Sequence, residues 1–528
     1  MIRMSYELSN KTFKSALIFI VFAELLSLCG FLLPSFMTVS FVVIMILFLV
    51  LTLYKLEYGL YIALAELFIG SKGYLFFLSI GDFTLSIRIA FWLVIMSVWA
   101  GRMISRIISR QTLNSSCSCF SLKHGHVLPY FLFLFFFIFW GAINGFLHDN
   151  AFSDIFLDFN GWLYFSLIFP LCDIFVFAPV NKKTKTAQTS FPAKDLMNIF
   201  MAAAVWLSTK ALFLLFVFSH NMVGLTTEIY RWVRLTGVGE LTQMQGGFYR
   251  IFFQSQIFVL AGFFIVLSLI AGHARKDGWR NKKIYALAAI ACLLLSSILV
   301  SLSRSFWAGF LAGLVFFAVY LFWRYNRKTA LQTGIFLAGL AAASLLLIFI
   351  TVKFPYPNPL GGFSTADLLT NRAVQIKGEA AVSSRWNLLP ELWKKIQREA
   401  VFGQGFGTKV TYESNDPRIR ETSTTGAYTT YAFEWGWLDI WLKLGIIGLL
   451  TYLLILFNIT FITAKILKNQ DDDLLAGLAF GLIVITAVNV FSPYLNHPLG
   501  IGYLILVATI LEARLGHFRC GQLSLDKN

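Results

Sequence analysis

Charged residues are scarce in this chain: 13% of its 528 residues are Asp, Glu, Lys or Arg, whereas 58% are hydrophobic. This composition excludes a water-soluble globular protein, because even a large soluble core leaves much of its chain exposed to water. Apolar runs of about 20 residues recur along the sequence, and that length spans the ~30 Å hydrocarbon core of a bilayer. We therefore expect an all-α polytopic membrane protein.

Cysteine is also scarce, and its placement excludes a disulfide framework. The six cysteines lie in predicted spans or in segments predicted to be cytoplasmic: Cys29, Cys117, Cys119, Cys172, Cys292 and Cys520. His124 and His126 follow Cys117 and Cys119, a combination that could bind a metal. Because that loop is short and rich in serine, we predict no metal site there and no cofactor.

About fourteen membrane spans are predicted, in three regions. Residues 1–352 hold the first eleven, 353–436 form one large loop, and 437–528 hold the last three and a short tail. The expected spans lie near 14–33, 36–54, 58–78, 86–104, 128–147, 159–179, 196–219, 250–272, 284–302, 305–323, 332–352, 437–464, 474–491 and 497–515.

The net charge of +16 is distributed as a membrane topology signal. Basic clusters lie in alternate short loops, which is the bias of cytoplasmic loops. They are Arg102/Arg106/Arg110, Lys182/Lys183/Lys185, Arg275/Lys276/Arg280/Lys282/Lys283 and Arg324/Arg327/Lys328. We therefore expect both termini in the cytoplasm and the large loop outside, and we expect membrane lipids rather than nucleic acid as partners.

The large loop contains one predicted helix, in "SSRWNLLPELWKKIQREAVF". Apolar residues recur there at helical spacing, and charged residues occupy the other face. The apolar set is Trp386, Leu389, Trp393, Ile396 and Val401. Tryptophan at the apolar edge of an amphipathic helix is typical of a helix that lies in the membrane interface.

Ionisable residues gather where the loop enters the next span, in "TTYAFEWGWLDIWLKLGIIGLL". Asp439 and Lys443 are four residues apart, the spacing of an ion pair on a helix. Glu434 precedes them, beside tryptophans that first indicate an interfacial aromatic belt. Stacking of these rings on sugars is the alternative.

Arginines lie on the same predicted outer side, at the junctions of spans and loops. They are Arg231, Arg234 and Arg250 around one loop, Arg304 before a span, and Arg385 in the large loop. Arginine binds phosphate oxygens bidentately and keeps its proton. Each could instead bind lipid headgroups at a span end.

Two other strings resemble functional motifs without their context. Gly403-x-Gly405-x-Gly407 resembles a phosphate loop, but no predicted strand precedes it, and a nucleotide would be on the wrong side of the membrane. Asp471-Asp472-Asp473 resembles a metal-binding acidic cluster, yet it falls in a short turn, and we expect a solvated turn.

Three strings in this order resemble the bacterial O-antigen ligase/polymerase superfamily over residues 296–450. The first is Ser301-Leu302-Ser303-Arg304, and the second combines Arg385-Trp386 with "FGQGFG". The third, "EWGWLDIWLKLGIIG", is similar to the family's His-Asn-x-x-Leu-x-x-x-x-Glu-x-Gly-x-x-Gly. Here Glu434, Trp435 and Lys443 replace its His, Asn and Glu.

The resemblance implies a membrane-embedded, polyprenyl-dependent glycosyltransferase fold in the bacterial inner membrane. Family members transfer a glycan from undecaprenyl pyrophosphate at the outer face of that membrane, and no metal is implied. Arg304 and Arg385 match the arginines that contact the pyrophosphate. Because ligases depend on the motif His, its replacement by Glu434 favours a polymerase, which transfers the glycan to another lipid-linked repeat.

The predicted site therefore has Glu434 as general base with Arg304 and Arg385 as catalytic cations. Substrate contacts are expected from six further residues: Arg231, Arg234, Arg250, Tyr431, Trp435 and Trp437. Chain-length regulators or flippases are candidate protein partners.

Two alternative functions remain open. One is an O-antigen ligase that transfers the glycan to lipid A core. The other is a flippase or transporter, which needs ionisable groups near the bilayer midplane. The candidates for such groups are few: Glu24, Glu66, Asp173 and Lys210.

Overall fold

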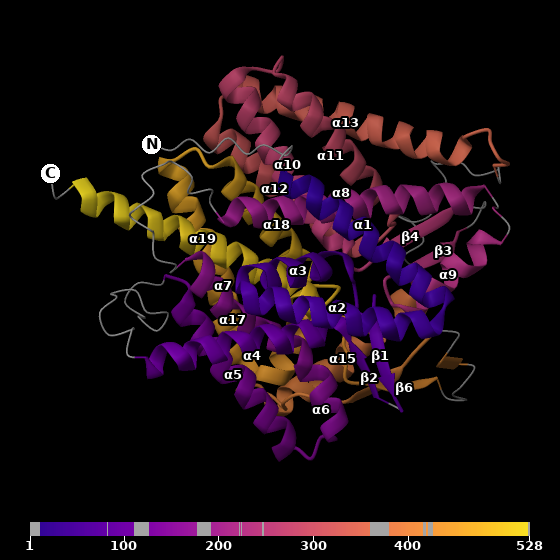
Figure 1. Cartoon of the computed structure of the whole chain (residues 1–528), viewed down its shortest axis with the longest axis vertical. Coiled ribbons are helices and arrows are strands. Elements are labelled where there is room, and N and C mark those ends of the chain that lie inside the picture. The colour runs from indigo at the N-terminus through magenta and orange to yellow at the C-terminus, as the bar shows by residue number, and fades with distance from the viewer. Residues whose placement is uncertain are drawn as a thin grey trace.

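The computed structural model describes residues 11–81, 83–109, 126–176, 192–220, 222, 224–244, 248–359, 380–415, 419–420 and 426–525. Most of these residues form helices that pack side by side, and three short hairpins lie at the edges of the bundle (Figure 1). The predicted all-α membrane fold is confirmed. The basic cluster at 182–185 and the Cys117/Cys119/His124 group lie outside the described residues.

Eleven long helices form the bundle: α1 (Lys11–Leu32), α2 (Pro34–Tyr54), α4 (Ile87–Ile108), α5 (Leu128–Leu147), α8 (Pro192–Ser219), α10 (Gln256–Asp277), α11 (Lys282–Val300), α12 (Arg304–Arg324), α13 (Arg327–Lys353), α17 (Gly436–Asn469) and α19 (Pro498–Leu525). Shorter helices connect or cover them: α3 (Leu56–Ile69), α6 (Phe152–Phe159), α7 (Ile168–Phe175), α9 (Leu225–Leu235), α15 (Ala380–Arg398), α18 (Asp473–Val488), and the 3-10 helices η1 (Asn160–Leu167) and η3 (Tyr494–Asn496).

Among the described residues, twelve helical segments are long and apolar enough to cross a membrane. Eleven are the long helices, with α8 counted over Lys194–Ser219 and α19 over Pro498–Leu515. The twelfth is the continuous stretch Phe152–Phe175 formed by α6, η1 and α7. The predicted spans 58–78 and 474–491 correspond to the shorter helices α3 and α18. The predicted count of fourteen is therefore not confirmed.

The expected span 58–78 is shortened by a buried ion pair. Arg88 Nε donates to Glu66 Oε2 at 2.9 Å, and Arg88 Nη1 donates to the Ser71 carbonyl at 2.6 Å. These contacts hold a turn directly after α3, where Gly73 adopts a positive φ of 88°. The chain then forms the hairpin of β1 (Phe77–Ile80) and β2 (Phe83–Ser86) instead of continuing as a helix.

The expected span 250–272 begins later than predicted, because its first residues form a strand. β3 (Gly239–Gln243) pairs with β4 (Tyr249–Phe253) in antiparallel register, Thr242 opposite Arg250. The side-chain oxygen of Gln256 accepts from the Phe253 amide at 3.0 Å, which ends the strand and begins α10. Arg250 is therefore a strand residue.

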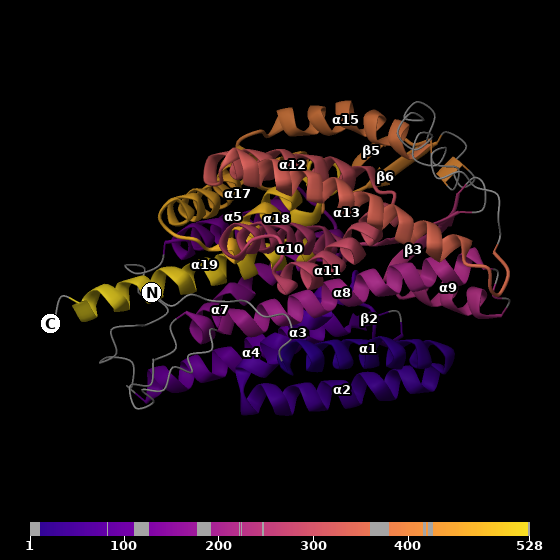
Figure 2. The same ribbon diagram turned by 90° about the horizontal axis from the view of Figure 1, so that it is seen from above.

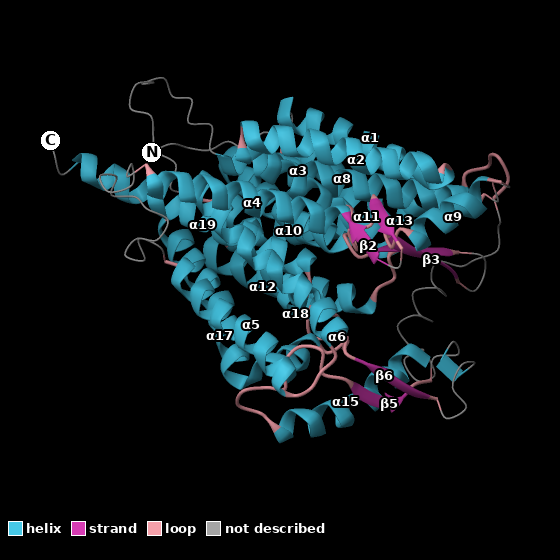
Figure 3. Ribbon diagram, turned by 60° about the horizontal axis from the view of Figure 1, so that its bottom comes forward, coloured by secondary structure: helices cyan, strands magenta, loops and turns pink. Residues whose placement is uncertain are grey.

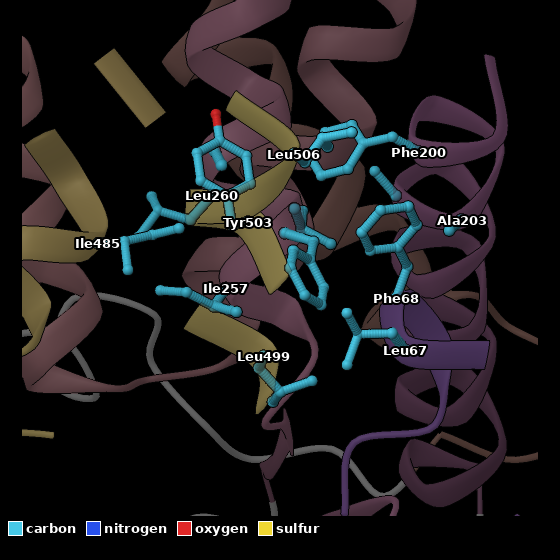
Figure 4. Packing of buried hydrophobic residues seen from close by; sticks show 14 of the residues in the cluster. Leu67, Phe68, Phe200, Ala203, Ile257, Leu260, Ile485, Leu499, Tyr503 and Leu506 are labelled. Atoms are coloured by element: carbon cyan, nitrogen blue, oxygen red, sulfur yellow. The ribbon is translucent and has the colours of Figure 1, made fainter. Parts of the chain in front are cut away.

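The densest packing surrounds α10, which is buried along almost its whole length. A helix that is apolar on every face is stable only when other helices surround it. Figure 4 shows part of this core, where Phe68 of α3, Phe200 of α8 and Tyr503 of α19 converge. By contrast, α2 and α13 keep large exposed apolar faces, as lipid-facing helices do.

Helix α15 and the hairpin of β5 (Val410–Glu413) and β6 (Ala427–Thr430) form a layer on one side of the bundle (Figures 2 and 3). The predicted amphipathic helix is present, but it buries a stripe of Leu388, Leu392 and Ile396. These side chains pack against Phe433 and Leu442. The tryptophans of the predicted apolar face remain on the surface, Trp386 being 57% and Trp393 42% exposed.

The glycine string after α15 joins this layer to the bundle. Helix α17 is broken at Gly445, whose φ of 71° lies in the left-handed region, so carbonyls in the preceding turn need other donors. The amide of Gln404 donates to Leu442 O at 2.7 Å, and that of Gly405 donates to Lys443 O at 3.2 Å. Gly403, Gly405 and Gly407 all have positive φ, so this string is a structural tether.

Candidate functional site

The loop 489–497 between α18 and α19 is the point where the predicted site elements meet. The ring of Phe491 lies 5.6 Å from that of Trp435, just before α17. The hydroxyl of Ser492 lies 3.1 Å from that of Ser305 in the first turn of α12. The hydroxyl of Tyr494 donates to the carbonyl of Gln254, after β4, at 3.1 Å. One loop therefore contacts the starts of α12 and α17 and the end of β4.

Two of the predicted arginines are associated with the start of α12, one in its first turn and one bound to the residues just before it. Arg304 is the first residue of that helix and is half-buried. Arg250 Nε donates to the carbonyl of Ser301 at 2.8 Å, and its guanidinium lies 4.9 Å from the centre of the Phe252 ring. The positive end of a helix dipole adds to the two guanidinium groups. This region is suited to a phosphate group.

Arg385 and Glu434 form an ion pair on the other side of the same loop. Both guanidinium nitrogens Nε and Nη2 of Arg385 donate to the Glu434 carboxylate, the second at 3.2 Å. The indole of Trp435 donates to the Arg385 carbonyl at 3.0 Å. Both charged side chains remain accessible, at 33% and 49% exposure. The residues singled out in two separate sequence strings are thus in direct contact.

A buried charge cluster lies inside α17, one turn beyond this pair. Lys443 Nζ is 2.6 Å from Asp439 Oδ1, which confirms the predicted helical ion pair. It is also 2.6 Å from Asp158 Oδ1 of α6, a partner that the sequence pattern did not reveal. Asn496 donates to Asp439 at 2.6 Å, and the amide of Gly407 donates to Asp158 at 3.0 Å. Both oxygens of Asp158 accept a hydrogen bond, whereas Asp439 Oδ1 has the Lys443 ammonium beside it without a hydrogen bond. Charges buried in this way depend on their partners.

His497 is a candidate that the sequence reasoning missed. It follows Asn496, whose side-chain amide donates to Asp439 in the charge cluster. Desolvation of the imidazole by the surrounding protein lowers the pKa of His497 to about 4. The positive charges of Lys443 and Lys72 also lower this pKa, and the negative charge of Asp158 opposes them. The ring is therefore neutral at neutral pH and able to accept a proton. The signal available in the sequence was its place between the last two predicted spans, on the side predicted to be outside.

The other predicted substrate contacts lie in different surroundings. Arg231 and Arg234 are exposed on α9, where Arg231 lies 3.5 Å from Glu228 and Arg234 faces the Tyr230 ring. Within the described part of the chain, these contacts stay on α9 itself and do not reach the loop 489–497. α9 lies away from α15 in all three ribbon views (Figure 1).

Two aromatic candidates flank the charge cluster. Trp437 packs edge-to-face against Tyr452 at 6.1 Å and is part of the helical core. Tyr431 is half-buried, and burial, together with the negative charges of Asp158 and Asp154, raises the pKa of its hydroxyl. Trp435 packs against Trp386 and Phe491, and its indole is hydrogen-bonded to the Arg385 carbonyl beside the ion pair.

The acidic turn 471–473 lies at the surface, with Asp471 42% exposed, and it is also held by ion pairs that the sequence did not reveal. Asp471 binds Arg275 at 2.5 Å and also Arg324, and these arginines lower the pKa of its carboxyl. Asp473 binds Lys276 at 2.5 Å, and Asp472 binds Arg514 at 2.9 Å. Among the described residues, no group of three or more His, Cys, Asp or Glu side chains could hold a metal ion.

The ionisable residues considered for a transporter are paired with one another or with arginine. Lys210 lies 2.6 Å from Glu24, Arg88 lies 2.9 Å from Glu66, and Arg106 lies 2.9 Å from Asp173. These pairs join α1 to α8, α3 to α4, and α4 to α7. These ion pairs therefore hold neighbouring helices together.

Taken with the fold, this arrangement defines a multi-pass membrane protein with a cationic, carboxylate-bearing site beside one large loop. Residues 288–453 match the family model described as O-antigen ligase. This match contains the start of α12, α15, the glycine string and the break in α17, and it confirms the resemblance to the O-antigen ligase/polymerase superfamily over that region. It supports ligase- or polymerase-type function without separating the two. A search of curated proteins found no match.

Proposed function

We propose that the chain is a polysaccharide polymerase of the bacterial inner membrane. It transfers a glycan from undecaprenyl pyrophosphate to a sugar hydroxyl of another lipid-linked repeat, at the outer face of the membrane. The observation that carries this proposal is the Arg385–Glu434 pair at the loop 489–497, with Arg250 and Arg304 on the loop's other side. Arg304, Arg385 and Glu434 lie within the region matched by the family, whereas Arg250 and the loop 489–497 lie outside it.

In the proposed reaction, the arginines stabilise the leaving group. The bond between the sugar C1 and the pyrophosphate oxygen breaks, and its electron pair leaves with the undecaprenyl pyrophosphate. Arg250, Arg304 and Arg385 neutralise the negative charge that develops there, an effect that is strong in a site that excludes water. Arginine suits this role because its fork matches phosphate oxygens and it does not lose its proton.

Glu434 acts as the general base. The acceptor hydroxyl oxygen forms the new bond to C1, and its proton passes to the Glu434 carboxylate. Arg385 holds that carboxylate through two donors, so binding of pyrophosphate competes for the same guanidinium. We propose that this competition turns Glu434 toward the acceptor only when the donor is bound.

Deletion of the gene and sizing of the surface polysaccharide tests the proposal. A polymerase defect leaves single repeats on lipid A core and removes long chains. A ligase defect leaves lipid-linked polymer and bare core, and a flippase defect leaves repeats on the cytoplasmic leaflet. Either of the last two results contradicts the proposal.

A ligase is the second candidate function, and His497 favours it. This neutral imidazole follows Asn496, which binds the charge cluster, and could take the part that the motif histidine has in ligases. A transporter is disfavoured, because the intramembrane carboxylates and Lys210 are engaged in ion pairs rather than lining a binding site.

A further inference from the structure

A polar cavity lies where the glycine string meets the corner between α5 and α6. Its volume is about 410 Å³, within the range of ~300–1,000 Å³ that small-molecule sites have. One wall is the corner segment His148–Asp154, and the other consists of Lys395 and the segment Gln404–Lys409. None of these residues belongs to the site proposed for the reaction.

The walls are held by contacts on both sides, so the cavity is preformed. His148 Nε2 lies 2.9 Å from Glu399 Oε1, and Lys409 Nζ lies 2.6 Å from Asp154 Oδ2. Asn150 donates to the Phe406 carbonyl at 2.9 Å. Preformed walls spare a ligand the free-energy cost of ordering them.

The lining has the chemistry of a binding site for sugar hydroxyls. It offers carboxylate, amide, hydroxyl and ammonium groups together: Asp149, Asn150, Asp154, Lys395, Gln404, Thr408 and Lys409. Within the described residues, the carboxylate of Asp149 and the ammonium of Lys395 form no ion pair and no side-chain hydrogen bond. The lining has two carboxylates and two ammonium groups, and its remaining ionisable residue, His148, is paired with Glu399, so it favours neither an anion nor a cation. A neutral polyhydroxyl ligand uses both kinds of group.

Helix α15 connects this cavity to the reaction site. It carries Arg385 near its beginning and Lys395 ten residues later, so the two lie about 15 Å apart along the axis at 1.5 Å per residue. A short oligosaccharide covers such a distance. A glycan that reacts beside Arg385 can therefore place its further sugars in the cavity.

We infer that this cavity is a saccharide subsite. It binds sugars of the glycan substrate that lie several sugar units away from the reacting bond. The inference rests on the proposed function for the identity of the glycan. It assigns Asp149 and Lys395 as hydrogen-bonding residues for sugar hydroxyls, and it gives the enzyme a means of recognising its own repeat unit.

Binding of free saccharide tests this inference without catalysis. The probe is the repeat-unit oligosaccharide of the source strain, released from its lipid by mild acid and titrated calorimetrically into full-length protein in nanodiscs. Lys395→Ala and the near-isosteric Asp149→Asn are expected to weaken binding about tenfold, a loss of ~1.4 kcal/mol. Lys394→Ala is the matched control, because Lys394 directly precedes Lys395 on α15 and its ammonium pairs with Glu391.

The outcomes separate the subsite from the polymerase proposal. Weakened binding in both variants, with thermal unfolding unchanged and with the KM for lipid-linked repeat raised at constant kcat, supports the subsite. Failure of the wild-type protein to bind the oligosaccharide, or equal binding by wild type and both variants, overturns it. If the wild type binds the oligosaccharide through these residues but does not lengthen chains, the subsite stands and the polymerase proposal fails.

Discussion

Arg385 and Glu434 are 49 residues apart in sequence and form a two-donor ion pair, in which Arg385 Nη2 donates to Glu434 Oε1 at 3.2 Å. The pair joins α15 to the residues that precede α17, and Trp435 reinforces it by donating to the Arg385 backbone. An arginine placed this way can bind the carboxylate or a pyrophosphate. The proposed mechanism depends on that exchange.

Glu434→Gln is expected to reduce chain lengthening by about 10²–10⁴-fold, the usual contribution of a general base. The amide keeps the size of the side chain but cannot take the acceptor's proton. The rate is measured with purified protein and lipid-linked repeat. Glu413→Gln is the control, since Glu413 lies on β5 in the same layer and is 68% exposed. Near-normal activity of Glu434→Gln would refute its role as base.

Arg304→Ala is expected to lower kcat by about 10²–10³-fold, as the loss of one preorganised charge donor does. The kcat of Arg304→Lys should lie between those of Arg304→Ala and the wild type, because lysine keeps the charge without the bidentate fork. Arg327→Lys is the control: Arg327 also begins a helix, α13, but at the opposite end of α12. Equal activity of Arg304→Ala and wild type would exclude a role in leaving-group stabilisation.

His497→Gln tests whether Glu434 or His497 is the base in chain lengthening. If Glu434 is the base, the variant should keep chain lengthening within about threefold, whereas loss comparable to Glu434→Gln would transfer the role of base to His497. The pH dependence of stability provides a second readout. Because the folded pKa of about 4 lies below the ordinary value, the unfolded chain binds more protons between about pH 4 and 6.5.

The folded state should therefore gain stability as the pH rises through that window. The thermal unfolding temperature of the wild type should increase more steeply between pH 4 and 6.5 than that of His497→Gln. Parallel curves for the two proteins would show that His497 does not titrate with a lowered pKa.

Lys443→Ala is expected to destabilise the fold by ~3–5 kcal/mol, because it leaves Asp158 and Asp439 buried without their cation. Thermal unfolding in detergent should show a large drop in midpoint. Lys465→Ala, an exposed position on the same helix, should change little. If both variants unfold at the wild-type temperature, the cluster does not support the fold as described.

Gly405→Ala tests the tether between the α15 layer and the bundle. An added Cβ at this residue would meet the backbone of Gly145, and its φ of 79° strains any other residue, at ~1–3 kcal/mol for the strain alone. Protease sensitivity of the α15 layer should increase. Gly101→Ala, where a Cβ meets nothing within 4 Å, is the control and should be neutral or stabilising. A wild-type protease pattern for Gly405→Ala would contradict the tether.

Hydropathy predicted the bundle well because about twenty apolar residues in a row have few other stable structures. It failed where polar pairing overrode length: Glu66 pairs with Arg88 and shortens α3, and Arg250 lies in a strand. Neither partner choice is visible in a hydropathy profile. The buried face of α15 also differs from the predicted apolar face. This helix has tryptophans on one side and leucines on another, so either side could have packed against the protein.

The site was predictable where its residues are close in sequence. Asp439 and Lys443 follow from helical spacing alone, and their ion pair is present. Asp158 lies 285 residues before Lys443, and only the folded chain brings the two together. His497 was overlooked because it stands alone in its loop, although the predicted topology already placed that loop on the side of the arginines.

The most direct test of the account is reconstitution of the purified protein in liposomes with undecaprenyl-pyrophosphate-linked repeat as the only glycan. The polymerase account predicts a ladder of lipid-linked chains that lengthens with time, and no ladder with Glu434→Gln. No lengthening by the wild-type protein, together with glycan transfer when lipid A core is added, would contradict it and establish a ligase.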